Sequence, residues 1–349
     1  MMHSYSKKRI IAAGIVLLAA LCAASAKSKK KNPAPQWLTM PAAVYSTSQY
    51  FTGVGSGAAR EEAGLEAVKN VASIFGQDIT AVTKASKRME QAQKEGKVAT
   101  ASSSTLGQSI TNQVNQDDII GIEIPEYYQD DSRKWYAIAI LDKPKVSKIY
   151  VSMIKKNKTE ISALVDDAES LGASLEAYSN LSFALEIASV NDGYIERLSV
   201  IDSAAADEVA KDVVTAKIIR TRMTALAREI PICVKIEGDK NSRLAAAFGK
   251  CFAKFGFKTS EDPNERYAVI GRFTFENDVM GKNFFSIYSL DSSLTDTFNG
   301  EALFPINFQG REGSTTEIDA NNRAYRVIEK KVATEFDKTI ADYLTKVRN

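Results

Sequence analysis

The stretch from Tyr50 to Phe75 reads YFTGVGSGAAREEAGLEAVKNVASIF and decides how the N-terminal region folds. A short apolar run leads into alternating glycines at Gly53, Gly55 and Gly57, and an alanine-rich segment follows them. Its apolar residues recur every three or four positions, which is typical of an amphipathic helix. We therefore predict a strand, a structural turn at the three glycines and a helix that lies close to its sheet.

The run Gly53–Ala58 also fits the GxGxxA pattern of dinucleotide-binding folds. Such a fold needs a βαβαβ continuation and an acidic residue that ends the second strand. Here the chain after the helix is polar and rich in serine, as at Ser102–Ser104, and the later strands favour a hairpin. The sequence therefore predicts no nucleotide site and no cofactor.

The N-terminus has the three parts of a secretory signal peptide. Basic residues at 7–9 precede the apolar run Ile10–Leu21, and Ala24-Ser25-Ala26 supplies a small-x-small cleavage site. The apolar run is shorter than the roughly 20 residues that a membrane-spanning helix needs. We predict a signal peptide over residues 1–26 and an exported protein.

A second interpretation of the N-terminus is a lipid anchor at Cys22, the candidate lipidation site. Leu21 stands where a lipoprotein signal has a small residue, so cleavage after Ala26 is favoured. Residues 27–35 form a basic linker that cannot bury a core. If Cys22 is lipidated, the lysines of this linker lie near the membrane surface and strengthen attachment. These lysines are Lys27, Lys29, Lys30 and Lys31.

Charge and histidine content limit the chemistry. The chain has 45 basic and 43 acidic residues, and this balance indicates no nucleic-acid partner. The single histidine, His3, lies in the predicted signal peptide, so the exported chain has neither a Ser-His-Asp triad nor the commonest zinc ligand. We predict no metal site, no catalytic residue and no enzyme activity. The acidic pairs Asp117-Asp118, Asp130-Asp131 and Asp166-Asp167 are interpreted as turn or surface residues.

Hydrophobic periodicity divides the exported chain into three regions, 36–145, 146–229 and 230–349. The first and third alternate strand and helix patterns, whereas the second has helical periodicity and no proline. The predicted fold class is α+β, with two α/β sandwich domains of mixed or antiparallel sheets joined by a helical segment. In the first region, Trp135–Leu141 is apolar on both faces and is predicted to be a central strand.

The helical segment is predicted to break or bend at Val190-Asn191-Asp192-Gly193. An apolar stripe from Val209 to Met223 indicates a further helix. Two interpretations stay open for this region. It is a helical hairpin that packs on itself, or an antiparallel arm that also offers a surface to a partner.

The third region holds the remaining cysteines. Cys233 lies in the predicted strand 230–237, and Cys251 lies on the apolar face of the predicted helix 242–255. Export permits a disulfide between Cys233 and Cys251, and the alternative is two buried free thiols. Further strands are predicted at 267–276, 283–291 and 301–309, and a long helix at 321–344.

The first region resembles the LPP-twenty family, the twenty-kilodalton outer-membrane lipoproteins. The residues that carry the resemblance are Trp37, the run Tyr50–Gly55, Ala63 and Ala67 of the helix, and the strand segments Ile120–Glu123 and Trp135–Ala139. The resemblance implies an exported α+β domain in the cell envelope with no established activity. The same domain type resembles the N-terminal part of a flagellar ring accessory protein.

These observations predict a non-enzymatic cell-envelope protein that acts as a scaffold or interaction module. Envelope proteins are the expected partners, in a periplasmic, outer-membrane or flagellar-associated assembly. The alternative is a small-ligand or peptidoglycan-binding module. Exposed aromatics at Tyr127, Tyr128 and Trp135 are its candidate contacts, and packing within the hairpin is the other explanation for them.

Overall fold

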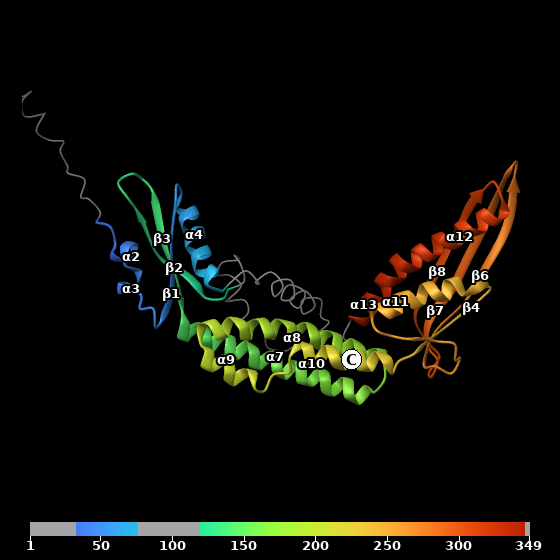
Figure 1. Ribbon diagram of the computed structural model, residues 1–349, viewed down its shortest axis with the longest axis horizontal. Coiled ribbons are helices and arrows are strands. Elements are labelled where there is room, and N and C mark those ends of the chain that lie inside the picture. The colour runs from blue at the N-terminus through green and yellow to red at the C-terminus, as the bar shows by residue number, and fades with distance from the viewer. Residues whose placement is uncertain (1–32, 76–118, 346–349) are drawn as a thin grey trace, which may run out of the picture. The chain divides into compact units, whose positions relative to one another are not determined.

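The computed structural model describes residues 33–75 and 119–345, which divide into two compact units (Figure 1). The predicted signal peptide, residues 27–32 of the linker and the pair Asp117-Asp118 lie outside the described residues. So do His3, the candidate lipidation site Cys22 and the linker lysines.

The N-terminal unit is an α+β domain built on a three-stranded sheet in the order β1-β3-β2. The strands are β1 (Tyr50–Gly57), β2 (Ile122–Gln129) and β3 (Trp135–Asp142). The helices are α2 (Gln36–Thr39), α3 (Pro41–Val44) and α4 (Arg60–Ala72). A short 3₁₀ turn, Ser73–Phe75, follows α4 in the chain, beyond the unit boundary at Val71. β3 is the central strand, as predicted, and it pairs antiparallel with β2. The β2–β3 register shifts between Glu123 and Glu126, beside Pro125, which has no N–H to donate to a ladder.

Gly53, Gly55 and Gly57 lie within β1, so the prediction that they form a turn is wrong. The chain reverses after them, where the Glu62 carboxylate accepts from the amides of Ala58 and Ala59 at 3.0 and 3.3 Å. None of the three glycines has a positive φ. A Cβ at Gly55 would lie 2.2 Å from the Ala67 nitrogen, so the glycines exist here for close contact between strand and helix.

From Lys143 onward, the described part of the second unit starts with four helices. They are α7 (Lys143–Leu171), α8 (Leu175–Ile201), α9 (Ser203–Ala210) and α10 (Ala216–Arg228). Asp142, Ser174 and Asp202 are the N-caps of α7, α8 and α9, and each side chain accepts a backbone N–H of the first turn. Helix α8 packs against the three others, and α9 also contacts α7.

Helix α8 runs without interruption through Val190-Asn191-Asp192-Gly193, so the predicted break is wrong. Asn191 is fully buried, accepts from Asn157 Nδ2 at 3.0 Å and donates to the Ile154 carbonyl at 3.2 Å. Asp192 accepts from the amide of Ala216 at 3.1 Å, at the start of α10. The polar residues that suggested a turn therefore form hydrogen bonds with neighbouring helices. The stripe predicted from Val209 to Met223 is split instead, because α9 ends at Ala210 and α10 begins at Ala216.

The C-terminal part of the second unit is a five-stranded mixed sheet in the order β5-β4-β6-β7-β8. Its strands are β4 (Ile232–Glu237), β5 (Thr259–Ser260), β6 (Tyr267–Met280), β7 (Asn283–Asp296) and β8 (Glu301–Ser314). Its helices are α11 (Arg243–Lys254), α12 (Glu317–Lys331) and α13 (Asp337–Leu344), with one π-helical turn, Val332–Phe336, between the last two. The three helices lie on one face of the sheet (Figure 1), and this arrangement confirms the α+β prediction.

The first turn of α8 forms hydrogen bonds and a ring contact with this C-terminal part. The Leu175 amide donates to Tyr267 Oη at 3.2 Å, and Tyr267 donates to Glu176 at 3.1 Å. Tyr178 donates to the Phe255 carbonyl at 3.0 Å, and its ring lies 4.7 Å from that of Phe257. Leu175 and Tyr178 therefore belong to the same hydrophobic cluster as the sheet.

We expect this junction to make the protein sensitive to alkali. Burial raises the pKa of Tyr178 to about 12 from the ordinary 10.0. The unfolded chain therefore releases this proton near pH 10, whereas the folded chain keeps it until about pH 12. The stabilising effect is complete below pH 10 and is lost as the pH rises to about 12. The free energy of unfolding, followed by circular dichroism, should fall less steeply over this interval in Tyr178→Phe than in the wild type. Parallel curves would contradict this reasoning.

Candidate functional site

The outer face of the C-terminal sheet carries a cluster that we call the hairpin-tip patch, made of Met280, Phe285, Ile287 and Arg311. Alternation along β7 turns Tyr288 and Leu290 toward the helices and Phe285 and Ile287 to the other face. Met280 ends β6 and is 56% exposed, and Ile287 is 40% exposed. The turn between the strands uses Gly281, whose φ of +66° favours glycine.

Arg311 of β8 holds the patch together. Its guanidinium lies 3.9 Å from the centre of the Phe285 ring and donates to Asp278 at 3.0 Å. The same Nη2 contacts Met280 Sδ at 2.9 Å, and Arg311 is the cross-strand neighbour of Ile287. These contacts hold the Arg311 guanidinium against the surface of the sheet. The patch could not be predicted from the sequence, because only the β6–β7–β8 register brings its residues together.

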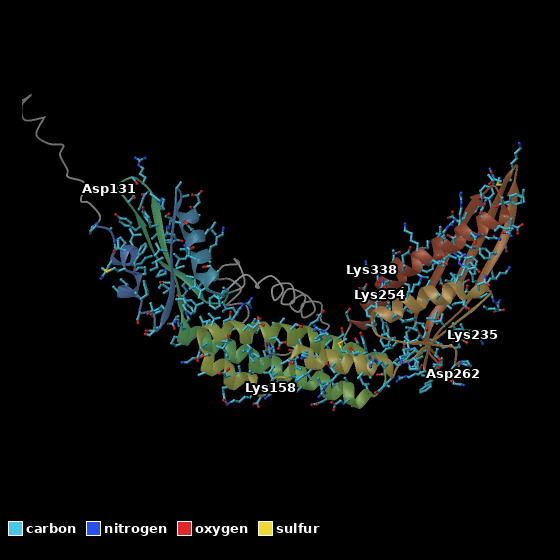
Figure 2. The ribbon with its side chains drawn as sticks, viewed as in Figure 1. Asp131, Lys158, Lys235, Lys254, Asp262 and Lys338 are labelled. Carbon is cyan, nitrogen blue, oxygen red and sulfur yellow. The ribbon has the colours of Figure 1, made fainter. Side chains whose placement is uncertain are left out.

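The two cysteines of the third region are free thiols, so the disulfide that we considered is not formed. Cys251 lies on α11 in the core, where its Sγ is 3.5 Å from the Val332 carbonyl. Cys233 lies on β4 with Lys235, and the two line a cavity outside that core. Ile232 and Ile236 occupy the core-facing positions of β4, so alternation turns Cys233 away from α11. Lys235 of β4 and Lys254 of α11 are labelled in Figure 2.

Both thiols should react slowly with alkylating reagents in the folded protein. Burial raises the pKa of Cys251 to about 11 and also raises the pKa of Cys233, and the thiolate is the reactive form. At pH 8, iodoacetamide should modify both cysteines only after the protein is unfolded, and omission of the reductant should not change this. A thiol pair that requires reduction before it reacts would contradict the free-thiol assignment.

The three aromatic candidates for ligand binding all lie in the β2–β3 hairpin. Tyr127 is covered by the Arg60 guanidinium at 4.2 Å from its ring centre, and its hydroxyl lies against Gly64 of α4. Tyr128 lies 6.2 Å from the ring of Tyr136, its cross-strand partner, and Trp135 is half-buried. Tyr127 and Tyr128 therefore take part in packing within the domain, and the structure does not bring the three together as one binding surface.

The acidic pairs within the described residues lie where the sequence placed them. Asp130 and Asp131 lie in the β2–β3 turn, and Asp166 and Asp167 lie exposed on α7. A hydrogen bond from Ser132 at 2.6 Å, together with the Lys134 amide at 2.9 Å, lowers the pKa of Asp130. Asp130 thus organises its turn.

In the described ranges no group of three or more His, Cys, Asp or Glu residues is placed to hold a metal ion. No helix in those ranges is both long and apolar enough to cross a bilayer.

One family model matches the N-terminal domain of the chain. Residues 35–142 match the family model described as LPP20 lipoprotein. The match confirms the resemblance carried by Trp37, the glycine strand and the two later strands. It covers the β1-β3-β2 sheet and ends where α7 begins.

Several solved structures are similar to this chain at low sequence identity. The secreted protein HP1454 from Helicobacter pylori is 12% identical, with a TM-score of 0.33, over 82% of this chain and 98% of its own. A minor lipoprotein from Acinetobacter baumannii is 15% identical, with a TM-score of 0.26, over 34% of this chain and 97% of its own. A lipoprotein from Caulobacter crescentus CB15 is 12% identical, with a TM-score of 0.27, over 36% of this chain and 98% of its own. No curated protein matches the chain.

Proposed function

We propose that this protein is a non-enzymatic interaction module of the cell envelope and binds another envelope protein through the hairpin-tip patch. The LPP20-family domain supports the envelope assignment. The observation that carries the binding role is the patch itself, an arginine already held against an aromatic ring between exposed Met280 and Ile287. Aromatic residues, Met and Arg are enriched in protein–protein interfaces, and Arg is among the residues that dominate binding energy.

The physical advantage of the patch is preorganisation. Arg311 loses little side-chain freedom on binding, because Phe285, Asp278 and Met280 already fix its position. In its ion pair with Asp278 both side chains are exposed, so the pair adds little to the stability of the fold. Its main effect is to orient the Arg311 guanidinium. Met280, which is more than half exposed, places apolar surface of the patch at the end of the hairpin.

The proposed location is the periplasm or the periplasmic face of the outer membrane. If Cys22 is lipidated, its acyl chains anchor the protein in the membrane. The four linker lysines then strengthen this attachment through electrostatic attraction to the membrane surface. Incorporation of labelled palmitate that is lost in Cys22→Ser would establish this anchor. Absence of label in the wild type would leave an unanchored exported protein.

The binding role is tested by crosslinking and affinity purification from envelope extracts of cells that express tagged full-length protein. Arg311→Ala should weaken capture of the partner by about 2 kcal/mol, as expected when a central interface arginine is truncated. The matched control is Arg272→Ala, since Arg272 is also exposed and ion-paired, to Glu237 at 2.9 Å, on the same sheet. Equal recovery of the same partner by Arg311→Ala, Arg272→Ala and the wild type would overturn the proposal.

A further inference from the structure

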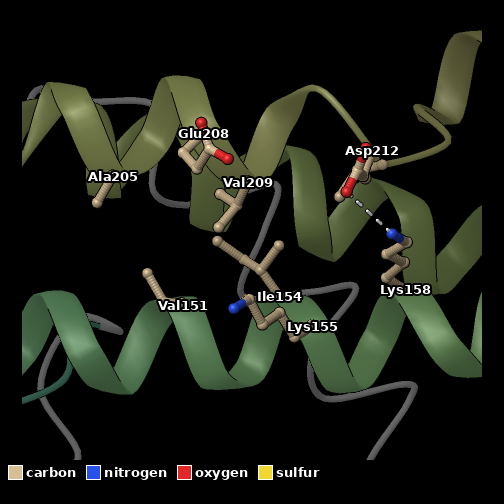
Figure 3. Close-up of a pocket in the computed structure, with 9 residues that line it drawn as sticks. Val151, Ile154, Lys155, Lys158, Ala205, Glu208, Val209 and Asp212 are labelled. Atoms are coloured by element: carbon tan, nitrogen blue, oxygen red, sulfur yellow. Dashed lines mark ion pairs between the residues drawn. The ribbon is translucent and has the colours of Figure 1, made fainter.

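A groove between α7 and α9 is a second feature that the hairpin-tip patch does not include. It has a volume of about 240 Å³, and its apolar lining comes from Val151 and Ile154 of α7 and from Ala205, Val209 and Val213. The side chains of Val151 and Ile154 point across the gap toward α9 (Figure 3). The apolar part of the lining is aliphatic and contains no aromatic ring.

The charged residues that line the groove sum to no net charge, but Glu208 pairs with a lysine outside the lining, so one lining lysine has no acidic partner. Lys158 pairs with Asp212 at 3.4 Å, shown by the dashed line in Figure 3, and Glu208 pairs with Lys211 at 2.7 Å. Lys155 also lines the groove, and it forms no ion pair with any of the described residues. The groove therefore presents one ammonium group without a counter-ion beside an aliphatic surface.

We propose that this groove binds an alkyl carboxylate, a ligand of the fatty-acid class. The carboxylate pairs with Lys155, and the first part of the alkyl chain lies on the aliphatic lining. The volume lies just below the range of about 300–1,000 Å³ for small-molecule sites, which suits a single alkyl chain and is too small for a docked helix. A neutral amphiphile would leave Lys155 unpaired, and a dianion would exceed the single free charge.

Dodecanoate is the probe. Its binding to the full-length protein is measured by isothermal titration calorimetry at dodecanoate concentrations below the critical micelle concentration. Two reference compounds separate the parts of the ligand. Acetate has the charge without the chain, and dodecyl maltoside has the chain without the charge. We expect dodecanoate to bind with a stoichiometry of one and both reference compounds to bind far more weakly.

Variants then locate the site. Lys155→Gln should weaken dodecanoate binding by about fivefold, the upper range for an exposed ion pair. Lys156→Gln, one residue further along and outside the groove lining, is the matched control and should bind as the wild type does. Ala205→Phe fills the groove and should abolish binding, and its circular dichroism spectrum checks that it folds. Because Lys155 is exposed, Lys155→Gln tests the site even if Ala205→Phe does not fold.

Three outcomes would overturn the proposal. The wild type does not bind dodecanoate, or Lys155→Gln and Lys156→Gln bind equally well, or dodecyl maltoside binds as tightly as dodecanoate. A loss of partner capture in Arg311→Ala has no bearing on these results, because Arg311 lies on β8 and the groove lies between α7 and α9.

Discussion

Gly55→Ala is expected to destabilise the N-terminal domain by about 3 kcal/mol or more, at or beyond the upper end for overpacked cores. The added Cβ would lie 2.2 Å from the Ala67 nitrogen and 2.3 Å from the Ala63 carbonyl oxygen. Both are backbone atoms of α4, so no side chain can rotate away. The helix must separate from β1, and this exposes Ala63 and Ala67, which are fully buried.

Tryptophan fluorescence measures this effect in the domain concerned. The chain has two tryptophans, Trp37 and Trp135, and both lie in the N-terminal unit. Urea titration of Gly55→Ala should therefore give a lower fluorescence midpoint than the wild type. Ser56→Ala, at the next position on the same strand, is the control and should change the midpoint little. Equal midpoints for Gly55→Ala and Ser56→Ala would show that close contact between β1 and α4 does not explain the glycine.

Asn191→Leu is expected to destabilise the helical part of the second unit by about 2 to 3 kcal/mol, because it leaves the buried amide of Asn157 without a partner. Asn191 is fully buried, and Asn157 is 5% exposed, so water cannot replace the lost hydrogen bond. The double variant Asn157→Leu/Asn191→Leu removes both polar groups. It should be more stable than the sum of the two single changes predicts.

Circular dichroism in urea gives the free energies for this double-mutant cycle. We expect a coupling energy of about 1 to 2 kcal/mol between the two positions, within the range found for residues in contact. The tryptophan fluorescence transition, which reports the other unit, should stay unchanged. Additive effects of the two substitutions would contradict a direct Asn157–Asn191 interaction.

Local patterns predicted the elements of the fold where one periodicity persists. Trp135–Leu141 is apolar on both faces and forms the central strand, and the predicted helix at 321–344 exists with a π-helical turn inside it. The prediction of a break at 190–193 was wrong because Asn, Asp and Gly are also turn residues. Asn191 is accommodated in a helix by Asn157, which is 34 positions away, and no local pattern contains that contact.

The glycines were misassigned for a related reason. Alternating glycines are compatible with a tight turn and also with a strand that a helix approaches closely, and only the packing of α4 distinguishes the two. The hairpin-tip patch and the α7–α9 groove were not predicted at all. Each combines residues from different elements, and their assembly depends on strand register or on helix packing.

Site-specific photo-crosslinking tests the proposed interaction most directly. A photoreactive amino acid replaces Ile287 at the hairpin-tip patch, or Arg272 elsewhere on the same sheet, in full-length protein expressed in cells. We expect one discrete crosslinked envelope protein from position 287 and none from position 272, and we expect the product to be lost when Arg311→Ala is added. No product at 287, or the same product at both positions, would contradict it.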